Sequence, residues 1–517
     1  MKFFAGLILC CFFAGIATRE EVLDVLMPDE EFDEVLQGGS LDGFFKYSEF
    51  WEAMQAIRND PENQRFVTPP LIIGHTFEKR NLLGFYLTSN THRLEEHKKN
   101  KNIIFFTSLH HAREPLSLTM TLLIVRNCLR ELRLEGQSKL KDFFRDNIIF
   151  FVPVVNTDSY IFINKHFYDT SMPGAKMIRK NRNVHPKCNE LAGGVDLNRN
   201  YDFQFAANEK GSSADPCKED YRGPHPFSEP ETQAIHEFVN RHPNVVVEVN
   251  IHTFGNTWII PFSFVSDKTN HYLQVKRPLF YDFYNEFEES LKKRNMHVKF
   301  GNASFTLDYP TNGNAGDWFT AKKNILNLDV ELGNSDPQSD QFYPPQDILA
   351  SIVNNNWKVM KLFLEDLIID LRHKVIIFKD RIRFEIQNTS VSALRDFSAF
   401  FELKSYGAPL GGYQLFYSVK SLMSDPIPQK EIHHHRETLT LDGRHILEID
   451  VVFENNDDMN NLAGLKMKAH RSFENEDDLD ETVDDCTDDG CPNEDFVDKD
   501  QSFFFMSGLN ERRKIIL

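Results

Sequence analysis

Residues 103–115 read IIFFTSLHHAREP, an unbroken apolar run that passes directly into a turn with two histidines, an arginine and a glutamate. A short run of large apolar residues is typical of a strand that is buried on both faces of a sheet. In open α/β sheets, functional sites form at the carboxyl ends of the strands. The stretch therefore predicts a buried strand with a functional loop at its end.

Further apolar runs alternate with helical patterns along the chain. Strand-like runs cover 148–152, 245–247 and 325–326, and helical spacing covers 47–57, 116–132, 229–239 and a long final stretch from Ile348 to Leu371. This alternation predicts an α/β domain with a mixed, largely parallel twisted sheet and helices on both faces. We place that domain at residues 42–372.

After Arg372 the hydrophobic period changes. Residues 381–386 and 447–451 alternate with period two, and together with runs at 399–403 and 414–419 they predict a small antiparallel β-sandwich-like domain at residues 373–457. Residues 458–517 are polar and dense in Asp and Glu between Glu474 and Asp500. We expect an acidic, disordered tail there.

The N-terminus and the cysteines favour export. Residues 1–17 combine a basic start, a short apolar core and small residues, which predicts a signal peptide, followed by a short acidic leader at residues 18–41. An oxidising compartment would permit the pairs Cys188–Cys217 and Cys486–Cys491, with Cys128 left over. Asn302 and Asn388 begin N-glycosylation acceptor motifs, for which the alternative is an unmodified surface loop. We expect a secreted protein, or one in the secretory pathway or a vacuolar lumen, with no transmembrane segment.

The charge balance excludes one class of partner. The 517 residues include 77 acidic and 58 basic side chains, a net charge of −19 at pH 7. Because this charge repels phosphate backbones, we expect no nucleic-acid partner.

The turn after the first strand offers ligands for a metal ion. His and Glu are both zinc ligands, and spacing alone permits either His111 with Glu114 or His110 with Glu114. His252 ends a second buried strand, and Glu331 lies near the end of a third. Asp329 and Glu331 are two residues apart, so both point to the same side of that strand.

The motifs together resemble the zinc metallocarboxypeptidase family that includes the pancreatic carboxypeptidases. The resemblance runs from about Leu41 to Arg372, and its blocks occur in the family's order. They are HARE at 111–114, RKNR at 179–182, GVDLNRN at 194–200, YRGP at 221–224, IHT at 251–253, Tyr309 before Trp318, and EL at 331–332.

The resemblance implies one Zn²⁺ per chain and a role for each matched residue. The implied ligands are His111, Glu114 and His252, and Glu331 is the general base for a zinc-activated water. Arg179 is expected to stabilise the oxyanion. Asn198, Arg199 and Tyr309 are expected to bind the terminal carboxylate of the substrate, and Arg113 to contact the substrate. The family also implies Asp196 as a partner of a zinc-binding histidine and Cys188–Cys217 as a disulfide.

The substrate is expected to be the C-terminal end of a peptide or protein. The pocket for the terminal side chain should lie near Ser263, Asn314, Ala315, Gly316 and Asp329. Gly316 leaves one pocket position without a side chain, and Asp329 can supply a negative floor, so we expect a preference for C-terminal Lys or Arg. Alternatively, a neighbouring cation neutralises Asp329 and the pocket takes apolar ends.

Two other functions are open from the sequence. One is hydrolysis of a specialised linkage, such as a γ-glutamyl or murein peptide bond. The other is a non-catalytic peptide-binding protein, which the complete set of ligands and Glu331 argues against.

Overall fold

The computed structural model describes residues 39–333 and 342–368, together with the strands that lie between Leu371 and Ser507. The signal peptide, residues 18–38 of the leader, Glu474–Asp500 and the pair Cys486–Cys491 lie outside the described residues. Within that part of the chain, no helix combines the length and apolar character needed to cross a bilayer.

The main domain is built on an eight-stranded mixed sheet. Its strand order is β1-β2-β4-β3-β5-β8-β6-β7. The pairs β4–β3, β3–β5, β5–β8 and β6–β7 are parallel, whereas β1–β2, β2–β4 and β6–β8 are antiparallel. The strands are β1 (Leu71–His75), β2 (Asn81–Leu87), β3 (Asn102–Ser108), β4 (Asn147–Val152), β5 (Val245–Thr253), β6 (Thr257–Ile259), β7 (Lys299–Gly301) and β8 (Leu326–Leu332).

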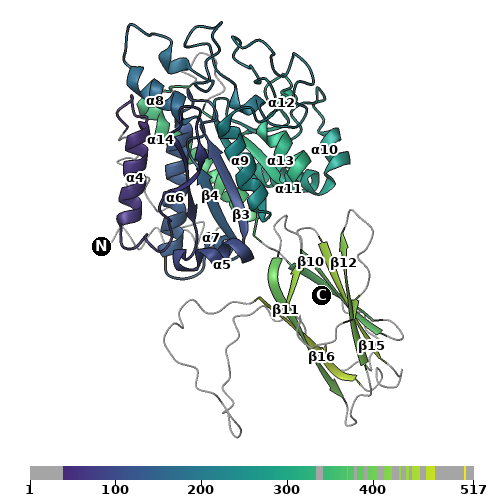
Figure 1. Ribbon diagram of the computed structural model, residues 1–517. Helices are drawn as coiled ribbons and strands as arrows, with labels where there is room; N and C mark the ends of the chain where they lie inside the picture. Colours follow the sequence, from purple (N-terminus) through teal and green to yellow (C-terminus); the bar gives the residue numbers. More distant parts are fainter. Residues whose placement is uncertain are drawn as a thin grey trace, which may run out of the picture.

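Helices cover both faces of this sheet (Figure 1). They are α4 (Tyr47–Asn59), α5 (Leu94–Asn100), α6 (Leu116–Arg133), α7 (Lys139–Asp146), α8 (Thr157–His166), α9 (Pro230–Arg241), α10 (His271–Lys276), α11 (Pro278–Lys293), α12 (Ala303–Thr306), α13 (Ala315–Lys323) and α14 (Gln346–Asp366). The prediction of a mixed, largely parallel sheet between helices is thus confirmed. The helix from Ile348 ends earlier than its spacing predicts, because Leu371 begins strand β9.

Alternate residues of each buried strand belong to different cores. Ile104 and Phe106 of β3 pack in the larger cluster with α4, α6, α11 and α14, whereas Ile103 and Phe105 pack in the smaller cluster with α9 and α13. Successive side chains of a strand point to opposite faces of the sheet. A strand in a sheet that is covered on both faces therefore requires apolar residues at every position. This explains the unbroken apolar run in the sequence.

On the face toward α9 and α13, the side chains change from apolar to polar near the carboxyl ends of the central strands. Thr107 on β3, Asn250 on β5 and Asp329 on β8 lie on that face, and all three are buried. The opposite face continues with Val249, Ile251 and other apolar residues. These buried polar residues therefore indicate where on the sheet a functional site lies.

The chain after Leu371 forms two antiparallel sheets, as predicted. Their strand orders are β13-β12-β15-β10-β9 and β14-β11-β16-β17. The strands are β9 (Leu371–Ile377), β10 (Arg381–Asn388), β11 (Leu394–Ser405), β12 (Tyr413–Ser421), β13 (Lys430–Glu431), β14 (Thr438–Leu441), β15 (His445–Phe453), β16 (Leu462–Arg471) and β17 (Met506–Ser507). Because β16 pairs with β11 along most of its length, strand structure continues beyond the predicted end at residue 457.

Candidate active site

The three predicted metal ligands converge at the carboxyl ends of β3 and β5. His111 and Glu114 lie in the turn between β3 and α6, and His252 lies near the end of β5. Because β3 and β5 are adjacent and parallel, their carboxyl ends meet at the same edge of the sheet. One ligand atom from each residue lies within 4.8 Å of the other two.

The Glu114 carboxylate is the centre of this cluster. Its Oε1 lies 2.8 Å from Nδ1 of His111, and its Oε2 lies 2.8 Å from Nδ1 of His252. His110, by contrast, bonds through Nε2 to the Tyr201 hydroxyl at 2.9 Å. The geometry therefore favours His111 over His110 as the partner of Glu114.

The donor set fits zinc. Two imidazole nitrogens and one carboxylate are a common set of protein ligands in catalytic zinc sites, and bond lengths near 2.0–2.2 Å allow such atoms to surround one ion. All three side chains are buried, with at most 3% of their surface exposed. Burying this many ionisable groups together is costly unless they serve a common partner.

Asp196 links the cluster to Arg179. Oδ1 of Asp196 lies 3.1 Å from Nε2 of His111, and its Oδ2 accepts a hydrogen bond from Nε of Arg179 at 2.9 Å. Although burial opposes ionisation, Arg179 and His111 hold the pKa of Asp196 well below its usual range. An ionised Asp196 can orient the His111 ring and leave Nδ1 for a metal.

Glu331 faces the ligands from the next strand. It lies on β8, where its Cα is paired with that of His252 on β5. Glu331 is half-buried, and burial together with the negative charge of Glu114 raises its pKa well above the ordinary value. The carboxyl group is thus near the ligands but outside the set of converging ligand atoms.

The residues predicted to bind a terminal carboxylate flank the same region. Asn198 and Arg199 lie in a short turn, each with 7% of its surface exposed, and the Asn198 amide is 3.3 Å from Nε2 of His252. Arg199 is fixed through Nε by the carbonyl of Gly211 at 3.0 Å. Tyr309 is half exposed, and it is close enough to Arg179 to contribute to that residue's raised pKa.

Arg113, in the turn between β3 and α6, has partners that the sequence did not reveal. Its guanidinium donates to Glu219 at 3.0 Å and stacks 4.4 Å from the ring centre of Phe342. Glu219 follows Cys217, which forms a disulfide with Cys188 as the family resemblance implied. No local pattern connects residues 113 and 219, so only the folded chain could show this contact.

Two further residues beside Asp329 were also missed. Glu248 on β5 and Asn327 on β8 are paired in register, and the Asn327 amide bonds to both Glu248 and Asp329. A signal was present in the sequence: Glu248 interrupts the apolar run from Val245, and Asn327 shares a strand face with Asp329. Among the described residues, no ion pair involves Asp329.

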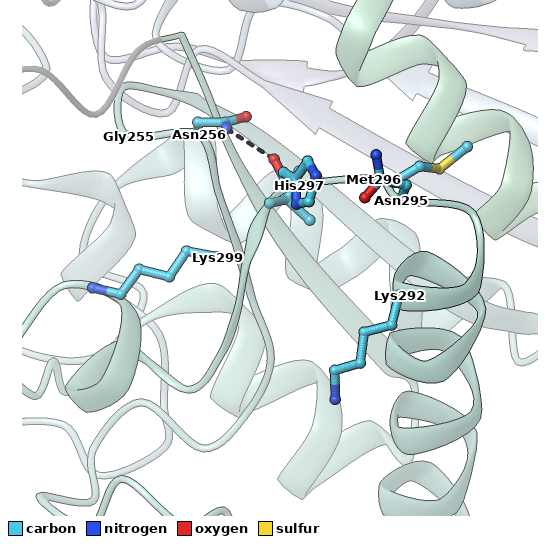
Figure 2. Close-up of a pocket in the computed structure, with 8 residues that line it drawn as sticks. Gly255, Asn256, Lys292, Asn295, Met296, His297 and Lys299 are labelled. Carbon is cyan, nitrogen blue, oxygen red and sulfur yellow. Dashed lines mark hydrogen bonds between the residues drawn. The ribbon is translucent and has the colours of Figure 1, made fainter.

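A surface cavity of about 490 Å³ is separate from these residues. Gly255, Lys292, His297 and Lys299 are among the residues that line it (Figure 2). Lys292 is paired with Glu288 and Glu289, and Lys299 donates to the Thr306 carbonyl. None of the residues predicted for catalysis, metal binding or substrate binding lines this cavity.

Comparisons with known proteins point to a single family. A family model described as zinc carboxypeptidase matches residues 54–359. Carboxypeptidase A4 of Mus musculus is 23% identical over 352 residues, which are 67% of this chain and 77% of the relative. Carboxypeptidase B2 of Rattus norvegicus is 25% identical over 350 residues, 66% of this chain and 77% of the relative.

A solved structure supports the fold. The crystal structure of thrombin activatable fibrinolysis inhibitor (TAFI) matches with a TM-score of 0.52 and 19% identity, over 68% of this chain and 80% of that chain. At this identity the likeness concerns the fold alone.

Proposed function

Because this chain belongs to the zinc carboxypeptidase family and is a metal-dependent carboxypeptidase, we propose that it releases single residues from peptides with a free α-carboxylate. The observation that carries the proposal is the convergence of His111, Glu114 and His252 beside Glu331. Zinc held by these three residues would supply a Lewis acid for the water and for the scissile carbonyl.

Glu331 acts as the general base and then as the general acid. Its position on the strand next to His252 suits a carboxylate that accepts a proton from the attacking water. The same carboxyl group then donates the proton to the leaving amine. Its half-buried position limits competing contact with bulk water.

Arg179 stabilises the negative charge that develops on the carbonyl oxygen. Its Nε and Nη2 are held by Asp196, which leaves Nη1 directed toward His111 at 3.2 Å and Glu114 at 3.9 Å. A cation held in place before the reaction needs no reorganisation in the transition state.

Asn198, Arg199 and Tyr309 bind the terminal carboxylate. Arg199 is buried, and its Nε and Nη1 are occupied by backbone carbonyls at Gly211 and Asn198. A substrate without a terminal carboxylate would leave this cation without its anionic partner, which is costly in a buried site. This requirement accounts for removal of terminal residues rather than internal cleavage.

We further propose that the enzyme prefers C-terminal Lys or Arg and is exported. Asp329 is buried, and none of the ion pairs among the described residues neutralises it. A cationic substrate side chain would supply the missing partner. The Cys188–Cys217 disulfide is consistent with an oxidising compartment. Residues 42–372 are proposed as the catalytic unit, with the β-domain following it.

The test is release of C-terminal residues from peptides by the purified protein. We expect release that stops with a zinc chelator, returns when zinc is restored, and falls by roughly 10³-fold or more in Glu331→Gln. An amidated peptide of the same sequence should not be cleaved. A specialised linkage would be indicated if γ-linked but not α-linked peptides were hydrolysed, and retained activity in Glu331→Gln would contradict the assigned base.

A further inference from the structure

A buried hydrogen-bond network lies beneath Asp329. The Asn327 amide nitrogen donates to Oδ1 of Asp329 at 3.2 Å and to Oε2 of Glu248 at 2.5 Å. Oε1 of Glu248 is bonded in turn to the Thr107 hydroxyl at 2.6 Å. The two amide hydrogens of Asn327 are thus divided between two carboxyl groups.

The side chains of the network differ in their exposure to solvent. Glu248 is fully buried and Asn327 is 1% exposed, whereas Asp329 keeps 7% of its surface accessible. Asn327 donates a hydrogen bond to Oδ1 of Asp329, and no ion pair between Asp329 and a basic side chain is present among the residues described. Asp329 is therefore the member of the network that can meet a ligand.

Gly316 makes room for Asn327. A Cβ at position 316 would lie 2.2 Å from Oδ1 and 2.8 Å from Cγ of Asn327. Separations under 3.0 Å force a shift, and Asn327 has little freedom because its backbone N–H and carbonyl both bond to the Tyr284 hydroxyl. Any side chain at position 316 would displace the Asn327 amide.

From this arrangement we propose that Asn327 and Gly316 are positioning residues for substrate specificity. Asn327 aims the Asp329 carboxylate at a cationic terminal side chain, and the missing side chain at Gly316 allows Asn327 to occupy that position. The inference rests on the proposed carboxypeptidase function. It goes further by assigning selection of basic ends to a three-residue unit on β8 and α13, rather than to Asp329 alone.

Glu248, on the neighbouring strand β5, supports this three-residue unit by holding Asn327 and does not attract the substrate. It is bonded at both carboxyl oxygens and has no exposed surface. Burial, reinforced by the charge of Asp329, raises the pKa of Glu248 well above its ordinary value. A neutral group of the same shape can therefore replace it.

The experiment compares three peptides that differ only in their terminal residue: arginine, citrulline and phenylalanine. Citrulline has the shape of arginine without its charge, so the ratio of kcat/KM for arginine over citrulline reports recognition of charge. We expect this ratio to fall roughly tenfold or more in Asp329→Asn, Asn327→Leu and Gly316→Ala. The kcat/KM for the phenylalanine peptide should fall less than that for the arginine peptide, because phenylalanine has no charge for Asp329 to recognise.

Three further variants separate positioning from general damage. Lys322→Ala alters an exposed residue of the same helix, α13, and should leave the ratio unchanged. The double variant Gly316→Ala/Asn327→Ala removes the clash between the two side chains. Its melting temperature should therefore return from that of Gly316→Ala toward that of the wild type, whereas the ratio of kcat/KM for arginine over citrulline should stay low. Glu248→Gln should keep the ratio within about threefold.

The outcomes distinguish failure of the proposed carboxypeptidase function from failure of the positioning role. If the wild type cleaves none of the three peptides, the proposed function fails, and this inference fails with it. If the wild type cleaves them but Asn327→Leu and Gly316→Ala keep the wild-type ratio, the positioning role is wrong while the function stands. A tenfold fall in Glu248→Gln would show that Glu248 acts by its charge and would overturn its assigned role.

Discussion

At the residue scale, Asp196 connects the candidate metal site to the guanidinium of Arg179. It contacts Nε2 of His111 on one side and the guanidinium of Arg179 on the other. A carboxylate in this position fixes both the ring orientation and the tautomer of a metal-binding histidine.

Replacing Asp196 should therefore weaken zinc binding. We expect Asp196→Asn to lower zinc affinity roughly 10–100-fold, measured by competition with a chromophoric chelator. Asp308→Asn, which alters an exposed carboxylate paired with Lys268, serves as the matched control. Unchanged zinc affinity in Asp196→Asn would mean that His111 is oriented without Asp196.

Another residue-scale effect concerns Glu231 in α9. It is fully buried, and its Oε1 accepts the Phe77 N–H at 2.9 Å. Burial, with the nearby charges of Glu229 and Asp158, raises the pKa of Glu231 to about 7. Below pH 4.5 both the folded and unfolded forms hold the proton, and between about 4.5 and 7 only the folded form does.

The free energy of unfolding should consequently fall as pH rises through this window. Glu231→Gln cannot ionise, so its stability relative to the wild type should increase by about 1–3 kcal/mol between pH 5 and pH 8. Urea unfolding at several pH values measures this change, and the pH slope is the test because any altered hydrogen bond contributes a constant offset. A pH-independent difference would show that Glu231 ionises normally.

At the element scale, the seam between β2 and β4 depends on a glycine. A Cβ at Gly84 would lie 2.5 Å from the Phe150 ring and 2.8 Å from the Phe151 carbonyl. Phe150 also stacks on Phe105 and on Phe238 of α9. The absence of a side chain at Gly84 therefore leaves room for the Phe150 ring.

Gly84→Ala should destabilise the fold by about 1–3 kcal/mol, since a packed ring and a strand backbone would both have to shift. The control is Gly174→Ala, whose Cβ would approach only the end of the Leu191 side chain at 3.1 Å. Chemical denaturation compares the two variants. Equal stability of both would show that the β2–β4 seam can adapt to a methyl group.

The packing of helix α12 determines whether the glycosylation motif at Asn302 is accessible. Asn302 begins a glycosylation acceptor, but it is fully buried, and its Oδ1 caps α12 by accepting the Phe305 N–H at 3.0 Å. Its Nδ2 donates to the Asp267 carbonyl at 2.6 Å. The amide nitrogen is therefore engaged in the folded chain, which argues against glycosylation after folding.

At the scale of the whole molecule, zinc should join distant parts of the chain. Glu114 and His252 are separated by 138 residues and come from different elements. An ion bound only by the folded arrangement stabilises the entire domain by mass action.

Zinc at about 100 times its dissociation constant should stabilise the protein by about 2.7 kcal/mol. Differential scanning calorimetry with and without a chelator measures this as a shift in Tm. The shift should disappear in His252→Ala. A zinc-dependent Tm shift that persisted in this variant would place the metal elsewhere.

The sequence alone predicted the architecture and the three residues that could hold a metal ion. The run from Ile103 to Phe106 predicts a doubly covered strand because both faces of that strand are buried, and period-two alternation predicts the later β-domain. His111, Glu114 and His252 were identified because their motifs occur in a specific order. These inferences succeed since strand and helix periods, and short motifs, are local properties of a chain.

Only the tertiary structure decided how the side chains pair. It placed Nδ1 of His111 against Glu114, a choice that spacing alone left open, joined Arg113 to Glu219, and brought Gly316 against Asn327. These contacts depend on strand register and helix packing, which place residues side by side that are separated by up to 106 positions. Sequence spacing carries little information about such distances, because packing of whole elements sets them.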